Sequence, residues 1–99
     1  MLILMGYIHI DPLDVDAFVR DVQAISLSTK AEEGCLFYGV TLDDREAGRF
    51  LVAERWRDEA ALTAHLARAE TLTFLKTWSD RMKGDLQTYA VMEERPGFD

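Results

Sequence analysis

The stretch that decides the fold is Phe50–Asp58, with the sequence FLVAERWRD. Side chains two residues apart point to the same face of a β-strand. One face here carries Phe50, Val52, Glu54 and Trp56. A carboxylate and an indole therefore project from an otherwise apolar face. The pattern predicts a strand over residues 49–57 whose inner face packs against helices.

The segments on either side extend this prediction. Residues 35–42 have a second strand pattern, and the polar segment 43–48 ends in a glycine, which predicts a hairpin between the two strands. On the other side, Asp58 is a good N-terminal cap for a helix, and the alanine- and leucine-rich residues 60–67 are strong helix formers.

The N-terminal third predicts one strand and one helix. Residues Leu2 to Ile10 are apolar on both faces, as in a strand that is covered on both sides. A helix should begin after Asp11 and end near Glu32-Glu33, with Gly34 as the stop signal. We expect Glu32 and Glu33 to be solvated.

The C-terminal third predicts a helical segment over about 72–82, a last strand over 86–93 and a loose tail over 94–99. The order is then β-α-β-β-α-β over a single domain, residues 1–99. This is the ferredoxin-like α+β arrangement, with a four-stranded antiparallel sheet and helices on one face. Since the first strand is apolar on both faces, the helix-free face should be covered by a second copy of the chain, giving a homodimer.

Composition excludes several classes of function. A net charge of -7 argues against nucleic-acid binding and against an anionic membrane surface. No apolar segment approaches the roughly 20 residues of a membrane span. The single cysteine, Cys35, rules out a disulfide framework and a multi-cysteine metal site. We therefore expect a cytoplasmic protein with no metal site.

Two segments carry a resemblance to a known family. They are Glu32–Tyr38, with the sequence EEGCLFY, and Phe50–Asp58, which is extended by the helix start Ala60–His65. With these segments the chain resembles the antibiotic biosynthesis monooxygenase family, which forms small dimeric α+β barrels and includes quinol and anthrone monooxygenases. The resemblance covers nearly the whole chain.

The resemblance implies a cofactor-independent monooxygenase that acts on a small aromatic phenol, anthrone or quinol. In such enzymes a bound phenol or hydroquinone loses a proton and the resulting anion passes an electron to oxygen, without metal or flavin. Haem-degrading relatives use an Asn on the first strand and a His on the later helical segment. Strand one here has no Asn, and Thr71–Lys76 contains no His, which disfavours haem degradation. The alternatives are a non-catalytic dimer that binds a small metabolite or responds to stress, and an isomerase or tautomerase.

The candidate catalytic residues are His65, Glu54 and Trp56. His65 lies three residues after Leu62, so both should share the inner face of their helix. As an imidazole that titrates near neutrality it is the best candidate base. Glu54 could act as a base or could orient His65, and Trp56 could form a pocket wall with an indole donor. The remaining substrate-binding candidates are Phe50, Val52, Leu62, Phe74, Trp78 and Tyr38. Each of these residues could equally serve only for packing.

Overall fold

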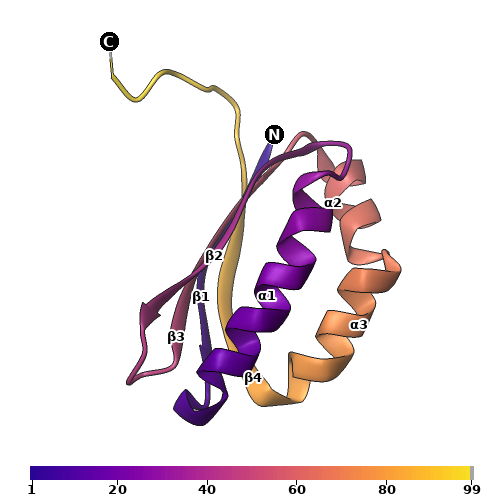
Figure 1. The fold of residues 1–99 in the computed structure, drawn as a ribbon. Helices are drawn as coiled ribbons and strands as arrows, with labels where there is room; N and C mark the ends of the chain where they lie inside the picture. The colour runs from indigo at the N-terminus through magenta and orange to yellow at the C-terminus, as the bar shows by residue number, and fades with distance from the viewer. Residues whose placement is uncertain (99) are drawn as a thin grey trace.

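The computed structural model describes residues 1–98, and Figure 1 shows its course. Its strands are β1 (Leu2–Ile10), β2 (Cys35–Asp44), β3 (Arg49–Trp56) and β4 (Met82–Ala90). Its α-helices are α1 (Val15–Lys30), α2 (Glu59–Leu66) and α3 (Ala69–Trp78). Two short 3-10 turns, η1 (Pro12–Asp14) and η2 (Ser79–Arg81), precede α1 and follow α3. The predicted ferredoxin-like α+β fold is confirmed.

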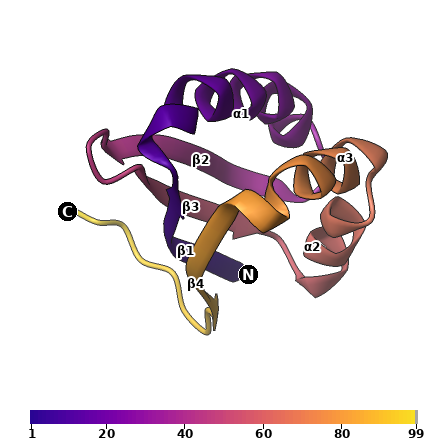
Figure 2. The same ribbon diagram turned by 90° about the horizontal axis from the view of Figure 1, so that it is seen from below.

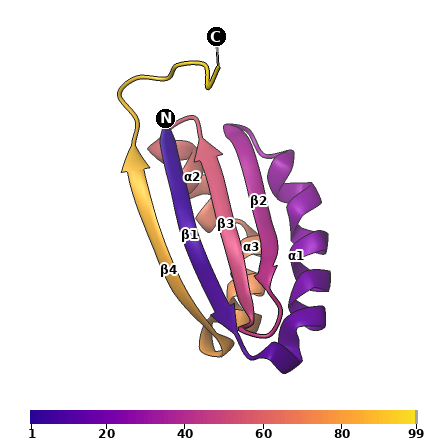
Figure 3. The same cartoon turned by 90° about the vertical axis from the view of Figure 1, so that its left-hand side faces the viewer.

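The four strands form one antiparallel sheet in the order β2-β3-β1-β4, which Figure 3 shows face on. All three α-helices lie on one side of it, and the other side is free of helices (Figures 2 and 3). In the register, Glu54 of β3 pairs with Leu4 of β1 and with Tyr38 of β2. These three side chains therefore lie on the helix-covered face.

The core lies between this face and the helices. Its aromatic centre is Phe18 of α1, whose ring lies 4.7 Å from that of Phe50 and 4.9 Å from that of Trp78. All three side chains are fully buried. The Trp78 indole donates a hydrogen bond to Asp21 at 2.8 Å, so α3 is held to α1 by both packing and a polar contact.

Local signals fix the element ends that later matter for the site. Asp58 caps α2 by accepting a hydrogen bond from the backbone N–H of Ala61 at 2.8 Å. Gly34 has a φ of +83°, in the region that L side chains avoid. A Cβ atom at this position would lie 2.5 Å from Cβ of Ala61. The glycine therefore lets the chain turn sharply after α1 and pass close beside α2.

The last third of the chain departs from the sequence prediction. The last strand covers Met82–Ala90 rather than 86–93, and the helix before it begins at Ala69 and ends at Trp78 rather than covering 72–82. The reason is strand pairing, since β4 follows β1 along its whole length, from Ile10 opposite Met82 to Leu2 opposite Ala90. The polar segment Lys83–Asp85 thus lies within an exposed edge strand instead of in the connection before it.

The tail has no helix or strand over residues 91–98, and the last position of the predicted loose tail, 99, lies outside the described residues. None of the helices within residues 1–98 is long and apolar enough to cross a membrane.

Candidate functional site

A cavity of about 140 Å³ lies between the sheet and the helices. Its wall is mainly apolar, as is typical of small-molecule sites. The side chains that can form hydrogen bonds there are Tyr38, Glu54, His65 and Thr71. The apolar part consists of Leu4, Ile8, Phe18, Ile25, Val40, Val52, Leu66, Phe74, Leu75, Met82 and Leu86.

Glu54 and Trp56 form one polar unit on β3. Because they are two residues apart, both point toward the helices, and the indole N–H of Trp56 donates to Oε1 of Glu54 at 2.9 Å. Glu54 is 7% exposed and Trp56 is fully buried. Burial raises the pKa of the Glu54 carboxyl, while the Trp56 hydrogen bond and the nearby His65 oppose the rise.

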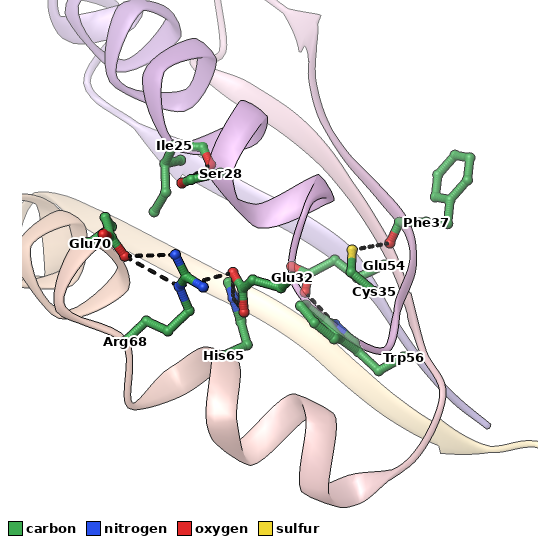
Figure 4. Close-up of polar contacts among 10 residues, drawn as sticks. All are labelled: Ile25, Ser28, Glu32, Cys35, Phe37, Glu54, Trp56, His65, Arg68 and Glu70. Carbon is green, nitrogen blue, oxygen red and sulfur yellow. Dashed lines mark hydrogen bonds and ion pairs between the residues drawn. The ribbon is translucent and has the colours of Figure 1, made fainter.

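His65 reaches the same cavity from α2. It is 5% exposed, and its ring lies 4.6 Å from that of Trp56, tilted by 30°. Its Nδ1 lies 2.9 Å from Oε2 and 3.2 Å from Oε1 of Glu32 (Figure 4). A carboxylate partner at this distance favours the tautomer in which Nδ1–H donates, and Nε2 then carries the lone pair. The contact with Glu32 therefore fixes the orientation of the imidazole.

One expectation from the sequence is wrong here, and one of the two roles considered for Glu54 is taken by another residue. Glu32 is not solvated, because its side chain is only 6% exposed, whereas that of its neighbour Glu33 is 87% exposed. The carboxylate that orients His65 is that of Glu32, since Glu54 is bonded to Trp56 instead. The turn at Gly34 is the physical reason, because it brings the end of α1 against α2.

The Glu32 carboxylate also belongs to a chain of charges (Figure 4). Nε of Arg68 lies 3.6 Å from Oε2 of Glu32, and the Arg68 guanidinium contacts Glu70 at 3.1 Å. Arg68 precedes α3 directly. The contacts thus join the end of α1, the inner face of α2 and the start of α3 at one point beside the cavity.

Tyr38 completes the polar wall. It lies opposite Glu54 in the sheet, and its ring meets that of His65 edge-on at 6.1 Å between centroids. Burial, and secondly the charge of Glu54, raise the pKa of the Tyr38 phenol well above its usual range. The phenol therefore keeps its proton and remains able to donate a hydrogen bond.

The structure gathers about half of the predicted site residues at the cavity. Its wall contains Tyr38, Val52, Glu54, His65 and Phe74. Trp56 lies behind this wall, in contact with Glu54 and His65. Phe50 and Trp78 instead belong to the aromatic core around Phe18, and Leu62 is half-buried on α2 without lining the cavity.

Sequence reasoning missed Glu32 and Thr71. The pairing of Glu32 with His65 spans 33 positions, so no local spacing indicates it. Thr71 follows the helix-forming residues without any motif of its own. Its position two residues after the start of α3 becomes informative only once that start is known.

A second hollow lies on the helical side. It is a groove of about 430 Å³ between α1 and α3, lined by residues that include Ile25 and Phe74. These two side chains also line the cavity, so they separate the two spaces. Residues 1–98 contain no group of three His, Cys, Asp or Glu side chains that could hold a metal ion.

The fold and the site together define a ferredoxin-like α+β protein with an apolar internal cavity and a buried imidazole. The particular family follows from the sequence, because the model of the antibiotic biosynthesis monooxygenase family matches residues 1–77. The chain belongs to this family.

Known relatives agree with this assignment. The chain is 28% identical over 86 residues to a Bacillus subtilis protein named "Putative monooxygenase YcnE", a match that covers 87% of this chain and 90% of that protein. An uncharacterised Synechocystis protein is 26% identical over 94 residues, covering 93% of this chain but 64% of the longer relative.

Solved structures show the same fold. A Deinococcus radiodurans structure from the same named group superposes over 100% of both chains, with a TM-score of 0.86 and 23% identity. A Pseudomonas aeruginosa protein has a TM-score of 0.80 and 27% identity, covering 93% of this chain and 94% of that one.

Proposed function

We propose that this protein is a cofactor-independent monooxygenase that acts on a small aromatic phenol, anthrone or quinol in the cavity between sheet and helices. The observation that carries the proposal is the buried Glu32–His65 pair at the wall of an apolar cavity. An oriented imidazole at the wall of an apolar pocket is suited to removing a proton from a phenolic hydroxyl. An apolar pocket of this kind suits an aromatic ring.

His65 is the proposed base. Its Nδ1 is held by Glu32, so Nε2 is the nitrogen that accepts the substrate proton. The negative charge of Glu32 stabilises the imidazolium that forms. Glu32 is thus a positioning residue that acts through His65.

Glu54, Trp56 and Tyr38 have supporting roles in this proposal. The Trp56 indole fixes the Glu54 carboxyl and forms the surface under the His65 ring. Tyr38, which keeps its proton, offers an O–H donor for the phenolate oxygen. Val52 and Phe74 supply apolar contacts to the ring of the substrate.

The overall reaction balances without a cofactor. A quinol and one molecule of oxygen give a hydroxyquinone and one water, so one oxygen atom enters the product and the other leaves as water. The substrate supplies all four electrons. An anthrone similarly gives an anthraquinone and water. The protein removes the first proton and holds the anion while oxygen reacts with it.

We also propose a homodimer formed through the helix-free sheet faces. That face exposes a group of large apolar side chains, Met5, Tyr7, Phe37, Leu51 and Tyr89, each at least 37% exposed. Monomeric proteins rarely leave such a contiguous group uncovered. Since both copies would offer the same face, the contact would be isologous.

The test of the function is oxygen uptake by the purified protein with methylhydroquinone, menadiol and anthrone. We expect uptake above the autoxidation rate with at least one of them, and a roughly 10²–10⁴-fold lower enzymatic rate in His65→Ala, the usual scale for loss of a general base. Glu33→Gln, which changes an exposed carboxylate beside Glu32, is the matched control and should keep the full rate. Equal uptake by wild type and His65→Ala would contradict the proposed base. Ligand binding without uptake would instead favour a non-catalytic binding protein.

A further inference from the structure

Thr71 has a buried hydroxyl that the fold does not use. It is the third residue of α3 and is 5% exposed, yet its Oγ1 has no hydrogen-bond partner within residues 1–98. Buried hydroxyl groups are nearly always hydrogen-bonded, so an exception of this kind needs an explanation.

The helix itself does not satisfy this hydroxyl. A helical Ser or Thr often donates to the carbonyl four residues earlier, as Thr77 of α3 does to Thr73 at 3.0 Å and Ser26 of α1 does to Val22 at 2.6 Å. Thr71 makes no such bond among the described residues. Its hydroxyl therefore keeps both its donor and its acceptor capacity.

The position of Thr71 suggests what uses that capacity. Thr71 lines the cavity together with Glu54 and His65. Those two side chains are already bonded, Glu54 to Trp56 and His65 to Glu32. A change of χ1 rotamer exchanges the methyl and hydroxyl groups of a threonine, so Oγ1 can be presented to a ligand.

The size of the cavity limits the ligand. Its volume of about 140 Å³ is close to the roughly 150 Å³ of an engineered apolar cavity that binds benzene in another protein. One aromatic ring fits such a space. A system of fused rings would have to push past Ile25 and Phe74 into the groove between α1 and α3.

We infer that the cavity selects a single-ring aromatic compound and that the Thr71 hydroxyl binds an oxygen atom on that ring. Thr71 is then a specificity-determining residue. The inference rests on the proposed function in taking this cavity as the substrate site, and it narrows the substrate from phenols, anthrones and quinols in general to those with one ring.

Phenol and toluene are suitable probes, because they have nearly the same shape and differ in the hydroxyl group. Their affinities are measured by titration of the protein amide signals in ¹H–¹⁵N spectra. We expect wild type to bind both and to bind phenol more tightly. Thr71→Val should weaken phenol binding roughly three- to tenfold, the scale of one lost hydrogen bond, and should leave toluene binding unchanged or tighter.

The chain offers a matched control in Thr29. Its Oγ1 is also buried without a partner in the described part of the chain, and the residue is 0% exposed, but Thr29 does not line the cavity. Thr29→Val should leave both affinities unchanged. Thr71→Ser retains the hydroxyl and should retain the preference for phenol, which keeps the test informative if Thr71→Val does not fold.

Three results would overturn the inference. The first is that wild type does not bind phenol. The second is that it binds phenol no more tightly than toluene. The third is that it binds anthrone more tightly than phenol. Oxygen uptake separates this test from that of the proposed function. Phenol binding that depends on Thr71, without oxygen uptake from methylhydroquinone, menadiol or anthrone, would leave the inference standing and overturn the monooxygenase. Oxygen uptake that depends on His65 but is unchanged in Thr71→Val would leave the monooxygenase standing and overturn the inference.

Discussion

At the scale of single residues, two buried carboxylates, Glu32 and Glu54, have different hydrogen-bond partners. Glu32 holds the imidazole of His65, and Glu54 is held by the indole of Trp56. One carboxylate thus orients the proposed base, while the other lies across the same cavity from it. Burial raises the pKa of the Glu54 carboxyl, and the negative charge of nearby Glu32 adds to this rise.

Glu54→Gln tests whether the ionised Glu54 carboxylate destabilises the folded protein. The raised pKa in the folded protein means that folding favours protonated Glu54. The contribution of Glu54 to the free energy of unfolding is complete below the ordinary carboxyl pKa. It is lost as the pH rises through the raised pKa of the folded protein. The amide of Gln is never ionised and can still accept from Trp56. We therefore expect Glu54→Gln to be more stable than wild type at pH 7, with the difference vanishing below about pH 4.

Urea denaturation at the two pH values measures this difference. A variant that is equally stable or less stable at pH 7 would show that the ionised carboxylate is not penalised in the folded state.

At the scale of elements, Glu32 joins α1 to the α2–α3 corner. Its carboxylate contacts His65 of α2 and Arg68 at the start of α3, and the Gly34 turn makes the approach possible. The same short segment thus positions His65, the proposed base, and holds together the helices that cover the cavity.

Glu32→Ala should loosen this corner. It leaves the Nδ1 group of a buried histidine without its partner, which typically costs about 1.5–3 kcal/mol for a hydrogen bond to a charged group. Amide hydrogen exchange should rise over Glu59–Leu66. Glu33→Ala, at an exposed neighbour, is the control and should cost less than about 0.5 kcal/mol. If the two variants lost equal stability, the contact between Glu32 and His65 would not stabilise this corner.

Local sequence signals determine some elements of this fold, and long-range contacts determine others. The alternation of Phe50, Val52, Glu54 and Trp56 predicted both the strand and its inner face, because a period of two is a local property. Asp58 likewise predicted the start of α2 through a local hydrogen bond. Glu32 and Glu33 look alike in sequence, and only the tertiary turn at Gly34 separates the buried one from the solvated one. The extent of β4 likewise does not follow from local sequence, since pairing with the distant β1 determines it.

At the scale of the whole molecule, the two faces of the sheet have different roles. One face and the helices enclose the cavity and the buried polar residues. The other presents Met5, Tyr7, Phe37, Leu51 and Tyr89, with Arg49 over the Tyr7 ring at 5.4 Å and Arg55 over the Phe37 ring at 5.7 Å. The proposed dimer would bury this second face.

Leu51→Glu tests the proposed dimer. It places a charge on the central strand pair of the apolar face, and an obligate interface of about 2,000 Å² or more should not tolerate it. Light scattering should give the mass of a dimer for wild type and of a monomer for the variant. Leu27→Glu, at a leucine of α1 that is 79% exposed, is the control and should remain dimeric. A monomeric wild type with native circular dichroism at micromolar concentration would refute the proposed assembly.

The most direct test of the central claim is isotope labelling of the product under ¹⁸O₂. The protein is freed of metal by a chelator and incubated with methylhydroquinone, and the quinone product is analysed by mass spectrometry. We predict one ¹⁸O atom per product molecule, formed without added metal or flavin and reduced to the autoxidation background in His65→Ala. Product without ¹⁸O, or turnover that appears only when a metal or flavin is added, would contradict a cofactor-independent monooxygenase.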